Sequence, residues 1–156
     1  MENNVKLLLK NFVFAILYPG IVAGVIPFWI IGGKLNELEK PHQFVGVFLF
    51  LAGFIIMTWC IVNFAVKGQG TLSPLAPTKK LVVSGLYKFS RNPMYIGVML
   101  ILTGETLFFA SYSLCVYSLI VFAGFNIFII FNEERRLKKD FGNDYDNYCK
   151  KVRRWI

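Results

Sequence analysis

Three segments of this 156-residue chain carry almost no charge, and they restrict what it can fold into. Residues 11–33 and 43–66 contain no charged side chain, and residues 92–132 contain a single one, Glu105. A helix rises ~1.5 Å per residue, so about 20 apolar residues cross a ~30 Å hydrocarbon layer. The third segment is long enough for two short crossings that double back. The sequence therefore predicts an all-α, polytopic membrane protein.

We expect four transmembrane helices within a single domain that covers residues 1–156. Beyond the last crossing, apolar residues recur three or four positions apart, which is typical of a helix with one apolar face. This pattern predicts a C-terminal amphipathic helical tail that acts either as a lid or as an interfacial anchor. The expected transmembrane helices are about 11–32, 44–66, 94–110 and 113–132, and the apolar stripe of the tail is Leu137, Phe141, Tyr145, Tyr148, Val152 and Trp155.

The distribution of the basic residues predicts the orientation of these helices. Of the 17 Lys and Arg residues, the four-helix arrangement puts all but Lys34 and Lys40 on one side. By the positive-inside rule, both termini and the long middle loop would then be cytoplasmic, in the cell membrane if the protein is prokaryotic. Basic residues beside anionic head groups explain the net charge of +8 without nucleic acid. We expect no metal site, because the lone histidine, His42, has no nearby cysteine, aspartate or second histidine.

Two polar clusters flank the third uncharged segment. Gly85-Leu-Tyr-Lys-Phe-Ser-Arg-Asn-Pro-Met-Tyr95 precedes it, and Glu133-Glu134-Arg135-Arg136 follows it. Pro93 has no N–H to donate and favours the first turn of a helix, so a helix should start there. If that segment is a helical hairpin, the clusters meet at the same membrane face. We predict that together they form an active site.

The side chains of these clusters are suited to binding a zwitterionic cofactor. Glu133 and Glu134 can hold an ammonium group or ribose hydroxyls, and Arg91 can hold a carboxylate through two hydrogen bonds. Tyr87 and Tyr95 can flank a purine or face a cation. A cofactor with an adenosine and a positively charged sulfur would fit such a site. Methyl transfer from that sulfur is an in-line displacement, for which alignment and exclusion of water supply much of the rate.

The C-terminal half of the chain carries a family resemblance. The segments that carry it are Leu81-Val-Val-Ser-Gly-Leu-Tyr-Lys-Phe-Ser-Arg-Asn-Pro-Met-Tyr-Ile-Gly97, Glu133-Glu134-x-x-Leu137, Phe141-Gly-x-x-Tyr145-x-x-Tyr148 and Val152-x-Arg-Trp155. These four segments resemble those of the isoprenylcysteine carboxyl methyltransferase and phospholipid methyltransferase family of integral membrane enzymes. The resemblance covers about residues 67–156. It implies a methyltransferase that uses S-adenosylmethionine and acts on a lipidic or amphipathic small molecule, which enters from the bilayer at the cytoplasmic face.

The same resemblance assigns roles to individual residues, in a cofactor site built from residues 67–95 and 133–156. The catalytic residues would be Arg91, Asn92 and Glu134. The cofactor would be held by Leu81, Val82, Gly85, Tyr87, Asn92, Pro93, Met94, Tyr95, Glu133 and Glu134.

The sequence departs from the family pattern at two positions. The commoner histidine before the proline is Asn92 here, and Ile129 stands where eukaryotic isoprenylcysteine enzymes have an arginine associated with the substrate carboxylate. These differences disfavour methylation of a prenylated cysteine and favour a different amphipathic acceptor. Two other functions remain open at this point: an NADPH-dependent membrane sterol-type reductase, and a non-enzymatic four-helix transporter with Glu105 as its coupling residue.

Overall fold

The computed structural model describes residues 17–33, 39–67 and 81–156. Over these residues the chain is helical and has no strand, which confirms the predicted all-α class for this part of the protein. The helical elements in chain order are η1 (Ile21–Val25), α2 (Ile26–Ile30), α3 (Pro41–Lys67), η2 (Gly85–Lys88), α4 (Pro93–Phe109), α5 (Tyr112–Phe128), η3 (Ile129–Glu133), α6 (Glu134–Phe141) and α7 (Asn143–Lys151).

Two described helices are long and apolar enough to cross a membrane, by length and composition. They are Pro41–Asn63 and Tyr112–Phe141, and only 17% of the most apolar window of each is buried within the protein. Helices with apolar side chains on all sides suit hydrocarbon rather than water. Leu17–Ile30 and Pro93–Phe109 are also apolar but shorter. Of the four predicted crossings, two therefore have candidates of full length, and the arrangement of four remains a prediction.

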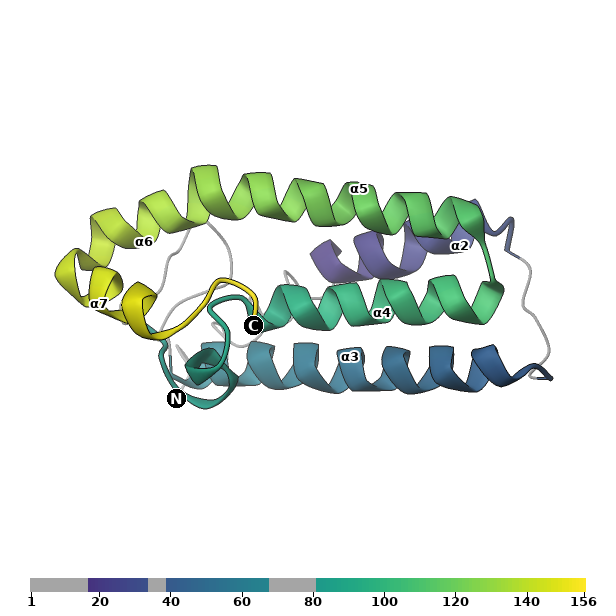
Figure 1. Ribbon diagram of the computed structural model, residues 1–156, viewed down its shortest axis with the longest axis horizontal. Helices are drawn as coiled ribbons and strands as arrows, with labels where there is room; N and C mark the ends of the chain where they lie inside the picture. Colours follow the sequence, from purple (N-terminus) through teal and green to yellow (C-terminus); the bar gives the residue numbers. More distant parts are fainter. Residues whose placement is uncertain (1–16, 34–38, 68–80) are drawn as a thin grey trace, which may run out of the picture.

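Glycine pairs bring α3 and α4 into backbone contact. The helices α3, α4 and α5 lie along the long axis of the molecule, and each runs antiparallel to the next (Figure 1). A Cβ atom added at Gly53 would lie 2.5 Å from the carbonyl oxygen of Gly97, and one added at Gly104 would lie 2.6 Å from that of Gly46. Small residues at such positions let membrane helices approach closely. Any larger side chain at these positions would push α3 and α4 apart.

The chain from α5 to α6 is one long helix with a π-helical turn, η3, inside it (Figure 1). The predicted last crossing ended at residue 132, but the helix continues to Phe141 and stops before Gly142, which has φ = +50°. α7 then folds back, and Tyr145, Tyr148 and Val152 are buried together against Leu81. The apolar stripe of the tail therefore packs within the protein.

The first described helix bends where its proline requires it. Pro27 lacks an N–H group, and its ring crowds the carbonyl of the residue four positions earlier. That residue, Ala23, has the non-helical angles φ = −114° and ψ = 24°, within the π-helical turn η1. Beyond the bend α2 contacts α5, and the π-helical turn η1 contacts α4.

We expect a single methyl group at the α3–α4 contact to destabilise the fold. Overpacking typically costs ~1–3 kcal/mol, and ~1 kcal/mol corresponds to ~2–4 °C in a chain of this size. Gly53→Ala and Gly104→Ala should each lower the melting temperature in detergent by about 4 °C or more. Gly124→Ala is the matched control, because a Cβ at this α5 glycine would meet nothing within 4 Å. Equal melting temperatures for all three variants would contradict the backbone contact.

Candidate functional site

The two polar clusters that flank the α4–α5 hairpin meet in the structure. Arg91 lies in the loop between η2 and α4, and Glu134 is the first residue of α6. Their side chains form an ion pair, with Arg91 Nη1 at 3.1 Å from Glu134 Oε1. The hairpin brings both residues to the same end of the molecule, as expected from the sequence (Figure 1).

Glu134 also pairs with a second arginine, from the C-terminal segment. Arg154 donates to the carboxylate through Nε and Nη2, both at 2.9 Å. These hydrogen bonds raise the pKa of the Arg154 guanidinium, so it stays charged. The side chains of Arg91 and Glu134 are only 14% and 20% exposed, which reduces screening by solvent. Loss of one partner would leave a charge in a poorly solvated position. Glu134 thus connects the loop before α4 with the C-terminal segment.

Backbone contacts fix Arg91 and Asn92 against the same C-terminal segment. The N–H of Arg91 donates to the carbonyl oxygen of Arg153 at 3.0 Å. The Asn92 side-chain amide and the Ser90 hydroxyl both donate to the carbonyl oxygen of Arg154, at 3.0 and 3.2 Å. The segment after α7 therefore determines where these two predicted catalytic residues lie.

The C-terminal segment is in turn anchored on α5. Trp155 Nε1 donates to Asn126 Oδ1 at 3.1 Å, and its ring lies 5.1 Å from that of Phe122, centroid to centroid. On the other side of the loop, Arg91 Nη1 lies 2.8 Å from the sulfur of Cys149 in α7. The tail therefore contacts the site region at two places, through Trp155 on α5 and through Cys149 on Arg91.

Glu133 has a different environment from its neighbour Glu134. It is the last residue of the π-helical turn η3, and the Tyr95 hydroxyl interacts with its carboxylate. The positive charge of Arg136 lies near both groups. The Nε atoms of Arg91 and Arg136 are buried and have no hydrogen-bond partner among the described residues. A carboxylate and two unused N–H donors therefore lie in this region.

The predicted cofactor residues before Arg91 are packed against α3. Gly85 has φ = +65°, and a Cβ atom there would overlap the ring of Trp59. Val82 and Tyr87 are buried with Cys60, and Met94 packs against them. Leu81 packs instead against the buried residues of the tail. The side chains of these residues fill the protein interior, which leaves their backbone for any ligand contact.

Tyr87, which packs against Cys60 of α3, also contacts α7. Its carbonyl oxygen accepts a 2.6 Å hydrogen bond from the Tyr148 hydroxyl, and burial raises the pKa of Tyr148 to about 12. Tyr148 therefore stays protonated and remains a donor at physiological pH.

Pro93 is the first residue of α4, as predicted, and it is buried. Residues 68–80, which belong to the predicted cofactor site, lie outside the described residues.

Arg154 and Cys149 lie within the predicted site range of residues 133–156, but their contacts with Glu134 and Arg91 were not predicted. The contact of Asn126 with Trp155 was not predicted either. The predicted apolar stripe of the tail did include Val152 and Trp155. α7 ends at Lys151, and the extended residue Val152 leads the chain to Arg154, which reaches Glu134.

Comparison with known proteins identifies the chain's relatives. The sequence profile of the phospholipid methyltransferase family matches residues 41–144. The chain belongs to the phospholipid methyltransferase family. This family implies a membrane methyltransferase, and the matched range contains both polar clusters.

An uncharacterized protein of Haemophilus influenzae is similar as well. It is 41% identical over 64 residues, which are 40% of this chain and 100% of that protein. No solved structure matches the chain.

We expect loss of the Arg154–Glu134 pair to release the C-terminal segment. Arg154→Gln removes both hydrogen bonds to Glu134 and should speed tryptic cleavage after Lys150 and Lys151 by about tenfold, since opening of the segment limits access of the protease. The control is Arg153→Gln, which removes an equivalent charge and cleavage site from an exposed side chain. Mass spectrometry of the fragments gives both rates. If the two variants are cleaved equally fast, the pair does not hold the segment.

Proposed function

We propose that this protein is an S-adenosylmethionine-dependent methyltransferase that methylates a lipidic or amphipathic small molecule at the cytoplasmic membrane face. Its family supports methyl transfer at a membrane. The observation that carries the proposal is the meeting of the two polar clusters, where the Arg91–Glu134 ion pair lies beside Glu133 and Tyr95.

The residues present fit the cofactor. The Glu133 carboxylate can accept hydrogen bonds from the cofactor's ammonium group or ribose hydroxyls. The unused Nε atoms of Arg91 and Arg136 can donate to its carboxylate. Tyr95 and Phe125 form an aromatic pair, 4.7 Å between centroids, that offers an apolar wall for a purine or a sulfonium. When bound, S-adenosylmethionine would supply a methyl group activated by a positive sulfur.

We assign different roles to the two glutamates and to the loop residues. Glu133 would bind the cofactor, whereas Glu134 would hold Arg91 and the C-terminal segment in place. Arg91 and Asn92, fixed by the backbone of that segment, would orient the reacting groups and exclude water. The π-helical turn η3 precedes Glu134 directly, and such turns are frequent at functional sites.

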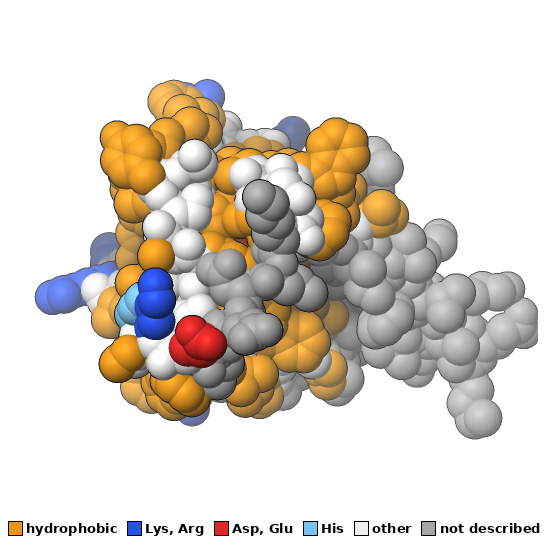
Figure 2. All heavy atoms as spheres, turned by 90° about the vertical axis from the view of Figure 1, so that its right-hand side faces the viewer, with side chains coloured by type: hydrophobic (Ala, Val, Ile, Leu, Met, Phe, Trp, Pro, Cys, Tyr) orange, Lys and Arg blue, Asp and Glu red, His pale blue; other side chains and the backbone are white. Residues whose placement is uncertain are grey.

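The arrangement of helices and charges supports four crossings with the site at the cytoplasmic face. α4 lies in contact with both α3 and α5 and is aligned along the same axis, so it would cross wherever they cross (Figure 1). Among the described residues, the face at the opposite end of the molecule shows mostly hydrophobic side chains and few charged ones (Figure 2). The described cations at the site end are Lys88, Arg91, Arg135, Arg136, Lys138, Lys139, Lys150, Lys151, Arg153 and Arg154.

The acceptor would differ from a prenylated cysteine carboxylate. Ile129, which replaces the arginine expected in eukaryotic isoprenylcysteine enzymes, is completely buried. It therefore offers neither a charge nor an exposed surface to a substrate carboxylate. The exposed apolar surfaces of α3 and α5 favour an acceptor that reaches the site from the bilayer.

We expect Glu133→Ala and Tyr95→Ala each to weaken cofactor binding. Loss of a hydrogen bond to a charged group costs ~1.5–3 kcal/mol, which corresponds to about 10–100-fold in Kd. Isothermal titration of S-adenosylmethionine into the detergent-solubilised protein measures this loss. Asp140→Ala is the control, because Asp140 is an exposed acid on α6. Unchanged affinity in both site variants would overturn the site assignment.

A second experiment tests the reaction class. Protein incubated with a membrane extract and S-adenosylmethionine labelled in its methyl group should transfer label to a lipid-soluble product, which mass spectrometry identifies. Glu133→Ala protein is the matched control and should give little labelled product. In the same assay supplied with NADPH, oxidation of the NADPH without transfer of label would favour a reductase and overturn the proposal.

A further inference from the structure

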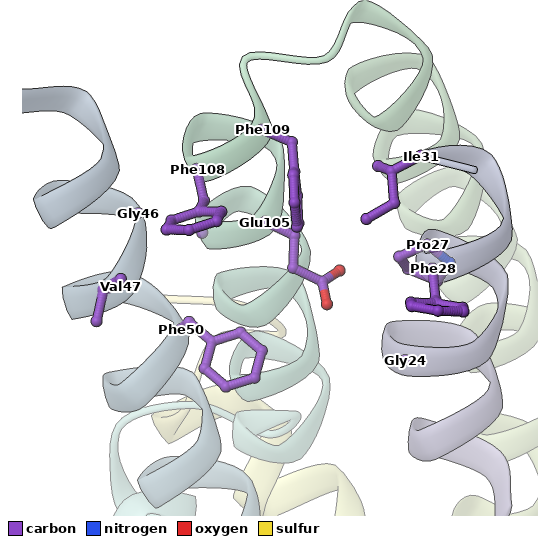
Figure 3. Close-up of a pocket in the computed structure, with 11 residues that line it drawn as sticks. Gly24, Pro27, Phe28, Ile31, Gly46, Val47, Phe50, Glu105, Phe108 and Phe109 are labelled. Carbon is purple, nitrogen blue, oxygen red and sulfur yellow. The ribbon is translucent and has the colours of Figure 1, made fainter. Parts of the chain in front are cut away.

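A cavity of about 320 Å³ lies between α2 and α3, beside α4, and it is separate from the proposed methyl-transfer site (Figure 3). Phe28 of α2, Phe50 of α3 and Phe108 of α4 contribute to its wall. Two glycines of the α3–α4 contact, Gly46 and Gly104, also line it. The cavity is thus built on the most closely packed helix pair in the described structure.

Glu105 is the single charged residue among those that line this cavity. Its carboxylate points from α4 into the space between α2 and α3 (Figure 3). The Oε2 atom is buried and has no hydrogen-bond partner among the described residues. The nearby Tyr117 hydroxyl does not serve as its donor, because it donates to the carbonyl oxygen of Val22 at 2.8 Å. A buried polar atom without a partner is costly and marks a place where a ligand can supply one.

We propose that this cavity binds a long-chain primary amine, with the ammonium group at Glu105 and the hydrocarbon against the phenylalanine side chains. A cation satisfies the carboxylate and is also attracted to aromatic faces. The volume lies near the lower end of the range typical of ligand sites, ~300–1,000 Å³, and suits a head group with the first part of its chain. Phe28 and Phe50 are 50% and 36% exposed, so the rest of the chain can leave along the apolar outer surface.

The lining favours an amine that carries no phosphate. An aminophospholipid would bring a phosphate beside its ammonium group, and none of the lining residues is a cation that could pair with it. A desolvated phosphate without a partner would cost more than the ammonium gains. The site is distinct from the Arg91–Glu134 region, so this proposal does not depend on the proposed methyl transfer.

The test is photolabelling of the full chain in phosphatidylcholine nanodiscs. The probe is a primary alkylamine with a diazirine in its chain, and mass spectrometry maps the labelled peptides. Labels should appear on the segments that contain Phe28, Phe50 and Phe108. Dodecylamine should compete at a concentration at least tenfold below that required for dodecanol or lysophosphatidylethanolamine. Labelling should fall about tenfold in Glu105→Gln and stay unchanged in Glu39→Gln, which removes an exposed carboxylate just before α3.

The comparison of competitors uses the unaltered protein, so it holds even if a variant folds poorly. Equal competition by dodecanol would show a merely apolar cavity and overturn the proposal. Equal competition by lysophosphatidylethanolamine would show that the phosphate is accommodated, and the choice of a plain amine would be wrong. Full labelling of a Glu105→Gln protein whose melting temperature is unchanged would show that the carboxylate does not select the ligand.

Discussion

The backbone contact between α3 and α4 fixes the relative position of the two helices that lead into the site. Gly46 meets Gly104 and Gly53 meets Gly97, so the glycines are seven residues apart on both antiparallel helices. That spacing fixes the register of the pair, because a shift along the axis would place side chains against backbone. With the register fixed, Trp59 near the end of α3 lies against Gly85. The contact of Trp59 with Gly85 thus links the α3–α4 pair to the loop that carries Arg91, which the C-terminal segment holds from its other end.

The sequence predicted the helices and the meeting of the clusters, because both follow from local rules. A run with a single charge had to double back, and Pro93 marked the start of α4. The sequence analysis divided the last crossing, which it ended at residue 132, from the amphipathic tail, whereas in the structure one helix continues through the charged cluster to Phe141. Charge does not end a helix, whereas Gly142 with its positive φ does. The glycines of α4 have the same seven-residue spacing in the sequence as those of α3, so the register of the two helices could also have been predicted.

The contacts of the C-terminal segment could not be predicted in the same way. The pairing of Arg154 with Glu134 depends on how α7 folds back and on the extended residue Val152 that follows it. Several cations in the tail were equally good partners by sequence, since residues 150, 151, 153 and 154 are all basic. Tyr148 and Val152 are buried against the segment before α4, and this packing places Arg154, rather than another of these cations, beside Glu134. Long-range side-chain pairing of this kind depends on tertiary packing, which composition and periodicity do not encode.

The three glutamates of the C-terminal half, Glu105, Glu133 and Glu134, differ in their surroundings, and these surroundings decide what each carboxylate can bind. Glu134 has two arginine partners, so its charge is used within the protein. Glu133, one residue earlier, has a tyrosine hydroxyl and a more distant arginine, which leaves its carboxylate able to accept a ligand's donors. Glu105 has a buried oxygen without a partner in the described residues and an adjoining cavity. A carboxylate in an apolar environment needs a compensating charge or hydrogen bond, and the three differ in whether the protein itself supplies it.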